Sequence, residues 1–87
     1  MKITRALVQV LRAMLTDPKA VRWGYDLMQA TGLRSGTLYP ILTRLEDEGY
    51  LTAEWASADE PGARRRFYTL TESGERFGRS VTDGREG

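Results

Sequence analysis

The segment from Ser35 to Leu51, SGTLYPILTRLEDEGYL, constrains the fold of this 87-residue chain more than any other stretch. Its apolar residues recur at i, i+3, i+4 and i+7, so they share one face of a helix; they are Leu38, Ile41, Leu42 and Leu45. We expect Ser35 to cap the first turn through its hydroxyl oxygen and Gly49 to end the helix in a left-handed conformation. The pattern predicts a helix over residues 35–49.

The opposite face of this helix carries small, hydroxylated or cationic side chains: Gly36, Thr37, Pro40, Thr43 and Arg44. Its acids are confined to the last turn: Glu46, Asp47 and Glu48. One end of the helix is therefore suited to a polyanion and the other is not. Pro40 lacks the N–H that the second turn normally uses, which favours an irregular or slightly bent first turn.

Two helices are predicted before this segment. The first begins at Thr4 and stops near Pro18, because proline cannot donate to the helical ladder and restricts the preceding residue. Residues 19–22 are predicted to form a polar connection, and a second helix covers residues 23–30 with Gly32 at its end. Trp23 and Tyr25 are expected to pack. Helix, short glycine-containing turn and helix form the helix-turn-helix pattern.

After Gly49 the apolar residues alternate, which is typical of a half-buried strand. A strand over residues 51–56, a loop over 57–63 and a strand over 64–70 predict a hairpin, or β-wing. Trp55 is expected in the core or between elements, and either Phe67 or Tyr68 faces the core with Leu70. Thr71 is predicted to cap a last helix over residues 72–81, weakened by Gly74 and Gly78, before a disordered tail at 82–87. The domain would span residues 1–81.

The composition argues against catalysis and metal binding. The chain has no cysteine and no histidine, so thiolate ligands and the commonest general base are absent. No metal-ligand spacing, phosphate loop or nucleophile elbow is visible, and we expect no cofactor and no enzymatic activity. No apolar run reaches the length of a membrane span and no signal peptide is visible, so a cytoplasmic protein is expected.

The charges indicate where a nucleic acid would bind. The net charge is +1, but residues 1–35 hold six Lys or Arg against two acids, and Arg64, Arg65 and Arg66 are consecutive. We expect a mainly α, winged helix-turn-helix domain that reads the DNA major groove with helix 35–49 and contacts phosphates through the wing 57–66. The groove candidates are Thr37, Tyr39, Thr43 and Arg44. Pairing of Arg44 with Asp47 or Glu48 is an equally supported alternative.

The chain resembles the PadR family of bacterial transcription regulators over residues 5–78. The matching motifs are WGYDL from Trp23, SGTLYPILTRLE from Ser35, GYL from Gly49 and RRFYTLT from Arg65, followed by Gly74. The resemblance implies a winged-helix repressor that acts as a homodimer on double-stranded DNA in the bacterial nucleoid. By motif, the DNA-reading residues are Ser35, Gly36, Thr37, Tyr39 and Pro40, with Arg64 and Arg65 at the wing. Arg34, which lies outside these motifs, is a further candidate for a phosphate contact.

Helical material after the wing is shorter here than is general in the family. A homodimer would therefore use the first helix, residues 4–15, and the C-terminal segment 72–81. Some family members respond to small phenolic or drug-like effectors, although no cavity is evident from this sequence. The main alternative function is a winged-helix protein-interaction module whose arginines serve solubility; a stand-alone effector sensor is a weaker one.

Overall fold

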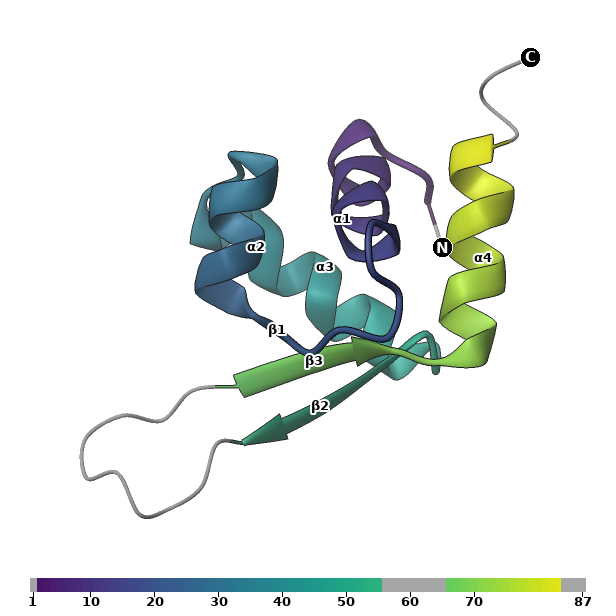
Figure 1. Cartoon of the computed structure of the whole chain (residues 1–87). Coiled ribbons are helices and arrows are strands. Elements are labelled where there is room, and N and C mark those ends of the chain that lie inside the picture. Colours follow the sequence, from purple (N-terminus) through teal and green to yellow (C-terminus); the bar gives the residue numbers. More distant parts are fainter. Residues whose placement is uncertain (1, 56–65, 84–87) are drawn as a thin grey trace.

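In a computed structural model, which describes residues 2–55 and 66–83, four helices stand on one side of a small antiparallel sheet (Figure 1). The chain order confirms the predicted winged helix-turn-helix fold and adds one short strand. The elements are α1 (Arg5–Leu15), β1 (Arg22–Trp23), α2 (Gly24–Thr31), α3 (Ser35–Asp47), β2 (Leu51–Trp55), β3 (Arg66–Leu70) and α4 (Glu72–Asp83).

Helix α1 begins and ends where the sequence predicts. The Thr4 side chain accepts a hydrogen bond from the Leu7 backbone N–H at 3.1 Å, which satisfies one of the free donors of the first turn. The buried face of the helix consists of Leu7, Val8, Val10, Leu11 and Met14. This face forms one side of the core.

The prediction that residues 19–22 form only a polar connection was wrong for Arg22, which lies in a strand. Arg22 and Trp23 pair with Tyr68 and Phe67 as strand β1, so the sheet has the order β1-β3-β2. The Arg22 guanidinium also donates to the Ala13 carbonyl at 3.2 Å. Strand β1 is therefore tied to β3 on one side and to the end of α1 on the other.

The hairpin settles which aromatic residue faces the core. Strand β2 pairs with β3 from Leu51↔Leu70 to Trp55↔Arg66. Tyr68 and Leu70 are buried on one face of β3, while the Phe67 ring lies 3.9 Å from the Trp23 ring on the other. Trp55 is 55% exposed and therefore does not lie in the core. Its ring lies beside Arg66 of β3, which agrees with the alternative expectation of a contact between elements.

Helix α4 begins at the predicted cap and ends later than predicted. The Gly74 N–H donates to the Thr71 hydroxyl oxygen at 2.9 Å. The helix continues to Asp83, so Thr82 and Asp83 are helical and not part of a tail, and Thr82 is buried. Residues 84–87 lie outside the described part of the chain.

The two glycines of α4 have low helix propensity, but they also give the helix a surface for close packing. Gly74, Gly78 and Thr82 recur every four residues and form the buried face of the helix. A Cβ on Gly74 would overlap the Tyr50 carbonyl oxygen, and one on Gly78 would lie 3.1 Å from Leu15 Cδ1. Small residues therefore let α4 lie close beside α1 and the start of β2.

Candidate nucleic-acid interface

The turn between α2 and α3 is held by local hydrogen bonds. Gly32 adopts φ 75°, a left-handed conformation that favours glycine, and its N–H donates to the Met28 carbonyl at 2.8 Å. The Thr31 hydroxyl donates to the Leu27 carbonyl at 2.6 Å and accepts from the Leu33 N–H at 3.2 Å. These bonds fix the angle at which the chain enters α3.

Helix α3 starts without a side-chain cap. The capping residue is Arg34 in an extended conformation, and Ser35 is already the first helical residue, so the prediction of a Ser35 cap was wrong. The preceding turn fixes the residue at which the helix starts, because the Leu33 N–H donates to the Thr31 hydroxyl oxygen. The Arg34 carbonyl accepts from the N–H groups of Thr37 and Leu38.

The end of α3 confirms the role predicted for Gly49. This residue has φ 83°. Its N–H donates to the Glu46 carbonyl and the Tyr50 N–H donates to the Leu45 carbonyl, at 3.0 and 2.9 Å. This pair of bonds is a Schellman motif, which satisfies carbonyls that the last helical turn leaves free. The helix itself ends at Asp47.

The predicted contact residues of α3 lie together on its exposed side. Leu38, Leu42 and Leu45 are fully buried and anchor the helix to the core. The helix runs through Pro40 without interruption, so this proline does not end it. Each of the predicted residues in and before the helix is exposed: Arg34, Ser35, Gly36, Thr37, Tyr39, Pro40, Thr43 and Arg44.

One flank of α3 borders a groove that is lined largely by aromatic side chains. The groove encloses about 930 Å³ and is lined by residues of α2, α3 and the sheet: Trp23, Gly24, Tyr25, Asp26, Tyr39, Thr43, Trp55, Arg66 and Tyr68. Tyr39 packs over Gly24 at the start of α2, so it joins α2 to α3 while remaining 39% exposed. Tyr25 is 64% exposed, which corrects the expectation that it packs.

An arginine that sequence reasoning treated only as part of a basic triplet connects the sheet to α3. Arg66 on β3 forms an ion pair with Glu46 on α3 at 3.2 Å, and its guanidinium lies 5.1 Å from the Trp55 ring centre. Burial raises the pKa of the neighbouring Tyr68, although the Arg66 charge acts in the opposite direction. Glu46 is therefore turned toward the wing and partly neutralised.

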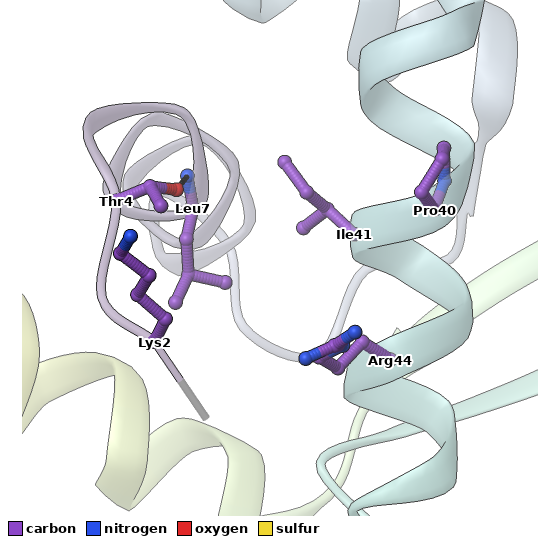
Figure 2. A pocket seen from close by; sticks show the side chains of 6 residues that line it. All are labelled: Lys2, Thr4, Leu7, Pro40, Ile41 and Arg44. Atoms are coloured by element: carbon purple, nitrogen blue, oxygen red, sulfur yellow. Dashed lines mark hydrogen bonds between the residues drawn. The ribbon is translucent and has the colours of Figure 1, made fainter.

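The other flank of α3 faces the start of α1. Among the described residues, no ion pair joins Arg44 to Asp47 or Glu48, so the intrahelical alternative is not present. Arg44 instead extends toward α1 across a cleft (Figure 2). The cleft holds about 220 Å³ and is lined by Lys2, Thr4, Leu7, Pro40, Ile41 and Arg44. Such cavities were not evident from the sequence.

Two predicted site residues, Arg64 and Arg65, lie outside the described residues. Within residues 2–55 and 66–83, no three His, Cys, Asp or Glu side chains gather as a metal site. Every helix in this part of the chain is too short or too polar to span a lipid bilayer. Three residues near the site were not predicted from the sequence: Lys2, Arg22 and Glu46. The position of each depends on a segment that is distant along the chain.

Comparison with known proteins agrees with the fold. A PadR-like protein from Bacteroides fragilis is 30% identical over 94% of this chain and 84% of its own, with a TM-score of 0.76. The smu.1704 protein of Streptococcus mutans is 30% identical over 99% and 84%, with a TM-score of 0.74. A PadR family regulator from Eggerthella lenta is 26% identical over 92% and 79%, with a TM-score of 0.71.

A comparison with curated proteins gave no match. The family model described as the transcriptional regulator PadR-like family matches residues 14–80, which include the helix-turn-helix, the hairpin and most of α4. Since this match covers most of the chain, and the solved structures share its fold from end to end, the protein belongs to the PadR-like family of transcriptional regulators.

Proposed function

We propose that the protein is a sequence-specific repressor that binds double-stranded DNA in the bacterial cytoplasm, with α3 in the major groove. The observation that carries this proposal is the two-sided construction of α3. Three fully buried leucines hold the helix rigidly, while Thr37, Thr43 and the small Gly36 form an unobstructed outer face. Hydroxyl groups and short side chains let a helix approach the base edges, where each base pair shows a distinct pattern of donors and acceptors.

The charges around α3 support the same orientation. The start of the helix is uncapped and follows Arg34, so backbone N–H groups and a cation are available to a phosphate. The acids are at the opposite end, where Glu46 is paired with Arg66. DNA would therefore approach the N-terminal half of α3, the end with a positive helix dipole.

The wing supplies the second contact in this proposal. Arg66 is occupied by Glu46 and Trp55, which leaves Arg64 and Arg65 as the arginines of the triplet assigned to phosphates. Phosphate contacts fix the position of a protein on DNA without reading the sequence. We therefore assign base recognition to α3 and phosphate binding to the wing.

The proposed homodimer uses residues 4–15 and 72–81. Helices α1 and α4 pack side by side, and α4 lies on the far side of α1 from α2 (Figure 1). A dimer formed there leaves α3 and the wing of each subunit free. An operator for such a dimer would be an inverted repeat with half-sites about one helical turn apart.

The test is selection of bound sites from a random pool of double-stranded DNA at near-physiological salt. An enriched inverted repeat supports specific reading by a dimer, and an enriched single half-site supports specific reading but refutes the dimer on DNA. No enrichment, with affinity for a protein partner that is indifferent to salt, would favour the protein-interaction module. Reduced transcription from a promoter that overlaps the selected site would identify repression.

Alanine variants distinguish phosphate binding by the wing from base recognition by α3. Replacing Arg64 and Arg65 by alanine should weaken binding to all sequences and reduce the salt slope by up to about two units. Thr37→Ala should lose affinity mainly for the selected site, on the scale of about 1–3 kcal/mol for a base contact. Lys19→Ala, in the α1–β1 connection, is the control and should change neither. Equal losses on selected and random DNA for both variants would refute this division.

A further inference from the structure

The open end of the hairpin, where β2 ends and β3 begins, is joined to α3 by an ion pair. Core packing weakens along β2, because Leu51 at its start is buried whereas Trp55 at its end is exposed. Opposite Trp55 in the sheet, Arg66 reaches Glu46 of α3 at 3.2 Å. We infer that Glu46 and Arg66 are positioning residues for DNA binding, which hold the wing at a fixed angle to α3. This inference rests on the proposed function and deepens it.

The ion pair is a second connection between α3 and the hairpin. The first connection is covalent, since Gly49 and Tyr50 lead from the end of α3 to Leu51, the first residue of β2. Trp55 lies four residues further along the strand, which at about 3.3 Å per residue places it roughly 13 Å from Leu51. The core therefore holds one end of the hairpin and the ion pair holds the other. Two separated attachments fix an angle that a single attachment leaves variable.

The guanidinium of Arg66 is enclosed, which suits it to positioning more than to binding a phosphate. Its central carbon lies 5.1 Å from the centre of the Trp55 ring, within the range of a cation–π interaction. Its Nε atom is buried and has no hydrogen-bond partner among the described residues, while its Nη2 atom donates to Glu46. The edge that these two nitrogens form, with which an arginine grips an anion through two parallel bonds, is therefore not open to DNA.

The burial of the pair determines what its loss would change. The side chains of Arg66 and Glu46 are 33% and 31% exposed, so salt screens their attraction less than it screens that of fully exposed charges. A pair that retains this much contact with water adds little to the free energy of unfolding. We therefore expect a chain without the pair to stay folded but to lose the fixed angle between α3 and the wing.

The sign of the expected effect separates positioning from simple charge effects. If Glu46 only repelled DNA or competed with it for Arg66, removal of the carboxylate would strengthen binding to every DNA sequence. A positioning role predicts a loss that is specific to the selected site, because base recognition by α3 and phosphate binding by the wing must then occur together. The ratio of the affinities for selected and random DNA isolates this loss, since a general charge effect acts on both.

The test measures this ratio by fluorescence anisotropy at one salt concentration, with the full chain. The variants are Glu46→Gln, Arg66→Gln and the double variant, whose net charge equals that of the wild type. We expect the ratio to fall at least about threefold in each single variant and no further in the double variant, because both residues act through one contact. Glu48→Gln is the matched control: it removes the same charge two residues further along, and Glu48 forms no ion pair among the described residues.

Three results would overturn the inference. The first is an unchanged ratio in Glu46→Gln, and the second is an equal fall in Glu48→Gln, which would show a general effect of charge. The third is a pair of losses that multiply in the double variant, which would show independent roles. Tighter binding of both DNAs by Glu46→Gln, with a smaller salt slope for Arg66→Gln, would assign Arg66 to a phosphate instead. Circular dichroism checks that each variant is folded.

Hydrogen exchange of the chain without DNA tests the same contact independently. In Glu46→Gln, the backbone amides of the paired residues Trp55 and Arg66 should exchange at least about threefold faster than in the wild type or in Glu48→Gln. Unchanged exchange would overturn the inference. If the wild-type chain prefers no DNA sequence, the proposed function fails, while faster exchange in Glu46→Gln still shows that the ion pair holds the open end of the hairpin.

Discussion

Three glycines provide a sharp test of how α4 docks, because one added methyl group meets a different environment at each. A Cβ at Gly36 on α3 would have nothing within 4 Å. A Cβ at Gly78 would lie 3.1 Å from Leu15 Cδ1, the end of a flexible side chain. A Cβ at Gly74 would overlap the backbone carbonyl of Tyr50, which has no comparable freedom to move. The structure therefore predicts three different effects of Gly→Ala.

The magnitudes follow from opposing contributions. Alanine is favoured over glycine within a helix by up to about 1 kcal/mol, and Gly36→Ala should show this gain alone. Gly74→Ala must push α4 away from Tyr50, whose carbonyl also accepts from the Thr71 N–H at 3.1 Å. Overpacking costs about 1–3 kcal/mol and a lost hydrogen bond about 1 kcal/mol, so the net loss of stability should be about 1–3 kcal/mol.

The assay is thermal unfolding of the three variants, followed by circular dichroism at one protein concentration, since a dimer would make Tm depend on concentration. For a domain of this size, a loss of about 1–3 kcal/mol lowers Tm by roughly 5–20 °C. Gly36→Ala should raise Tm slightly, and Gly78→Ala should fall between the two because the Leu15 side chain can shift. A Gly74→Ala protein as stable as Gly36→Ala would refute the close approach of α4 to Tyr50.

Three further predictions concern stability. Pro40→Ala should raise the free energy of unfolding by about 1–3 kcal/mol in urea titration, because alanine supplies the missing helical N–H; unchanged stability would contradict this. Arg22→Ala should lower it by about 1–2 kcal/mol, since the guanidinium bonds to the Ala13 carbonyl and the Thr16 hydroxyl are lost, and Arg22→Lys should recover only part. Burial raises the pKa of Tyr68, so its contribution to stability is complete below the unfolded value of about 10 and is lost as the pH rises through the folded value. Tyr68→Phe should flatten the stability profile above that pH, and an unchanged slope would count against the buried hydroxyl.

The exposed side chains of α3 show how far local patterns reach. Periodicity identified Leu38, Leu42 and Leu45 as the buried stripe, and by exclusion it identified the outer residues. It did not establish where Arg44 points, because Asp47 and Glu48, three and four residues further along the helix, were possible partners. In the structure Arg44 extends toward α1 instead (Figure 2).

The features that the sequence alone did not predict share a cause. Trp55 has the alternation of a core strand residue, yet it lies at the border of a groove and is exposed. Gly74 and Gly78 have poor helix propensity, yet they form the buried face of α4. Propensity and alternation describe a residue and its near neighbours, whereas burial depends on which distant segment packs there.

By itself the sequence determined the order of the elements and several of their ends. The residues at these ends act through hydrogen bonds and backbone conformations within a few residues, so their roles can be predicted from the sequence; they are Thr4, Gly32, Gly49 and Thr71. Only the tertiary structure decided that Arg22 binds the end of α1, that Arg66 pairs with Glu46, and that Thr4 and Arg44 line one cleft. These pairs of residues are 9 to 40 positions apart, and no local spacing rule records which segments will lie together.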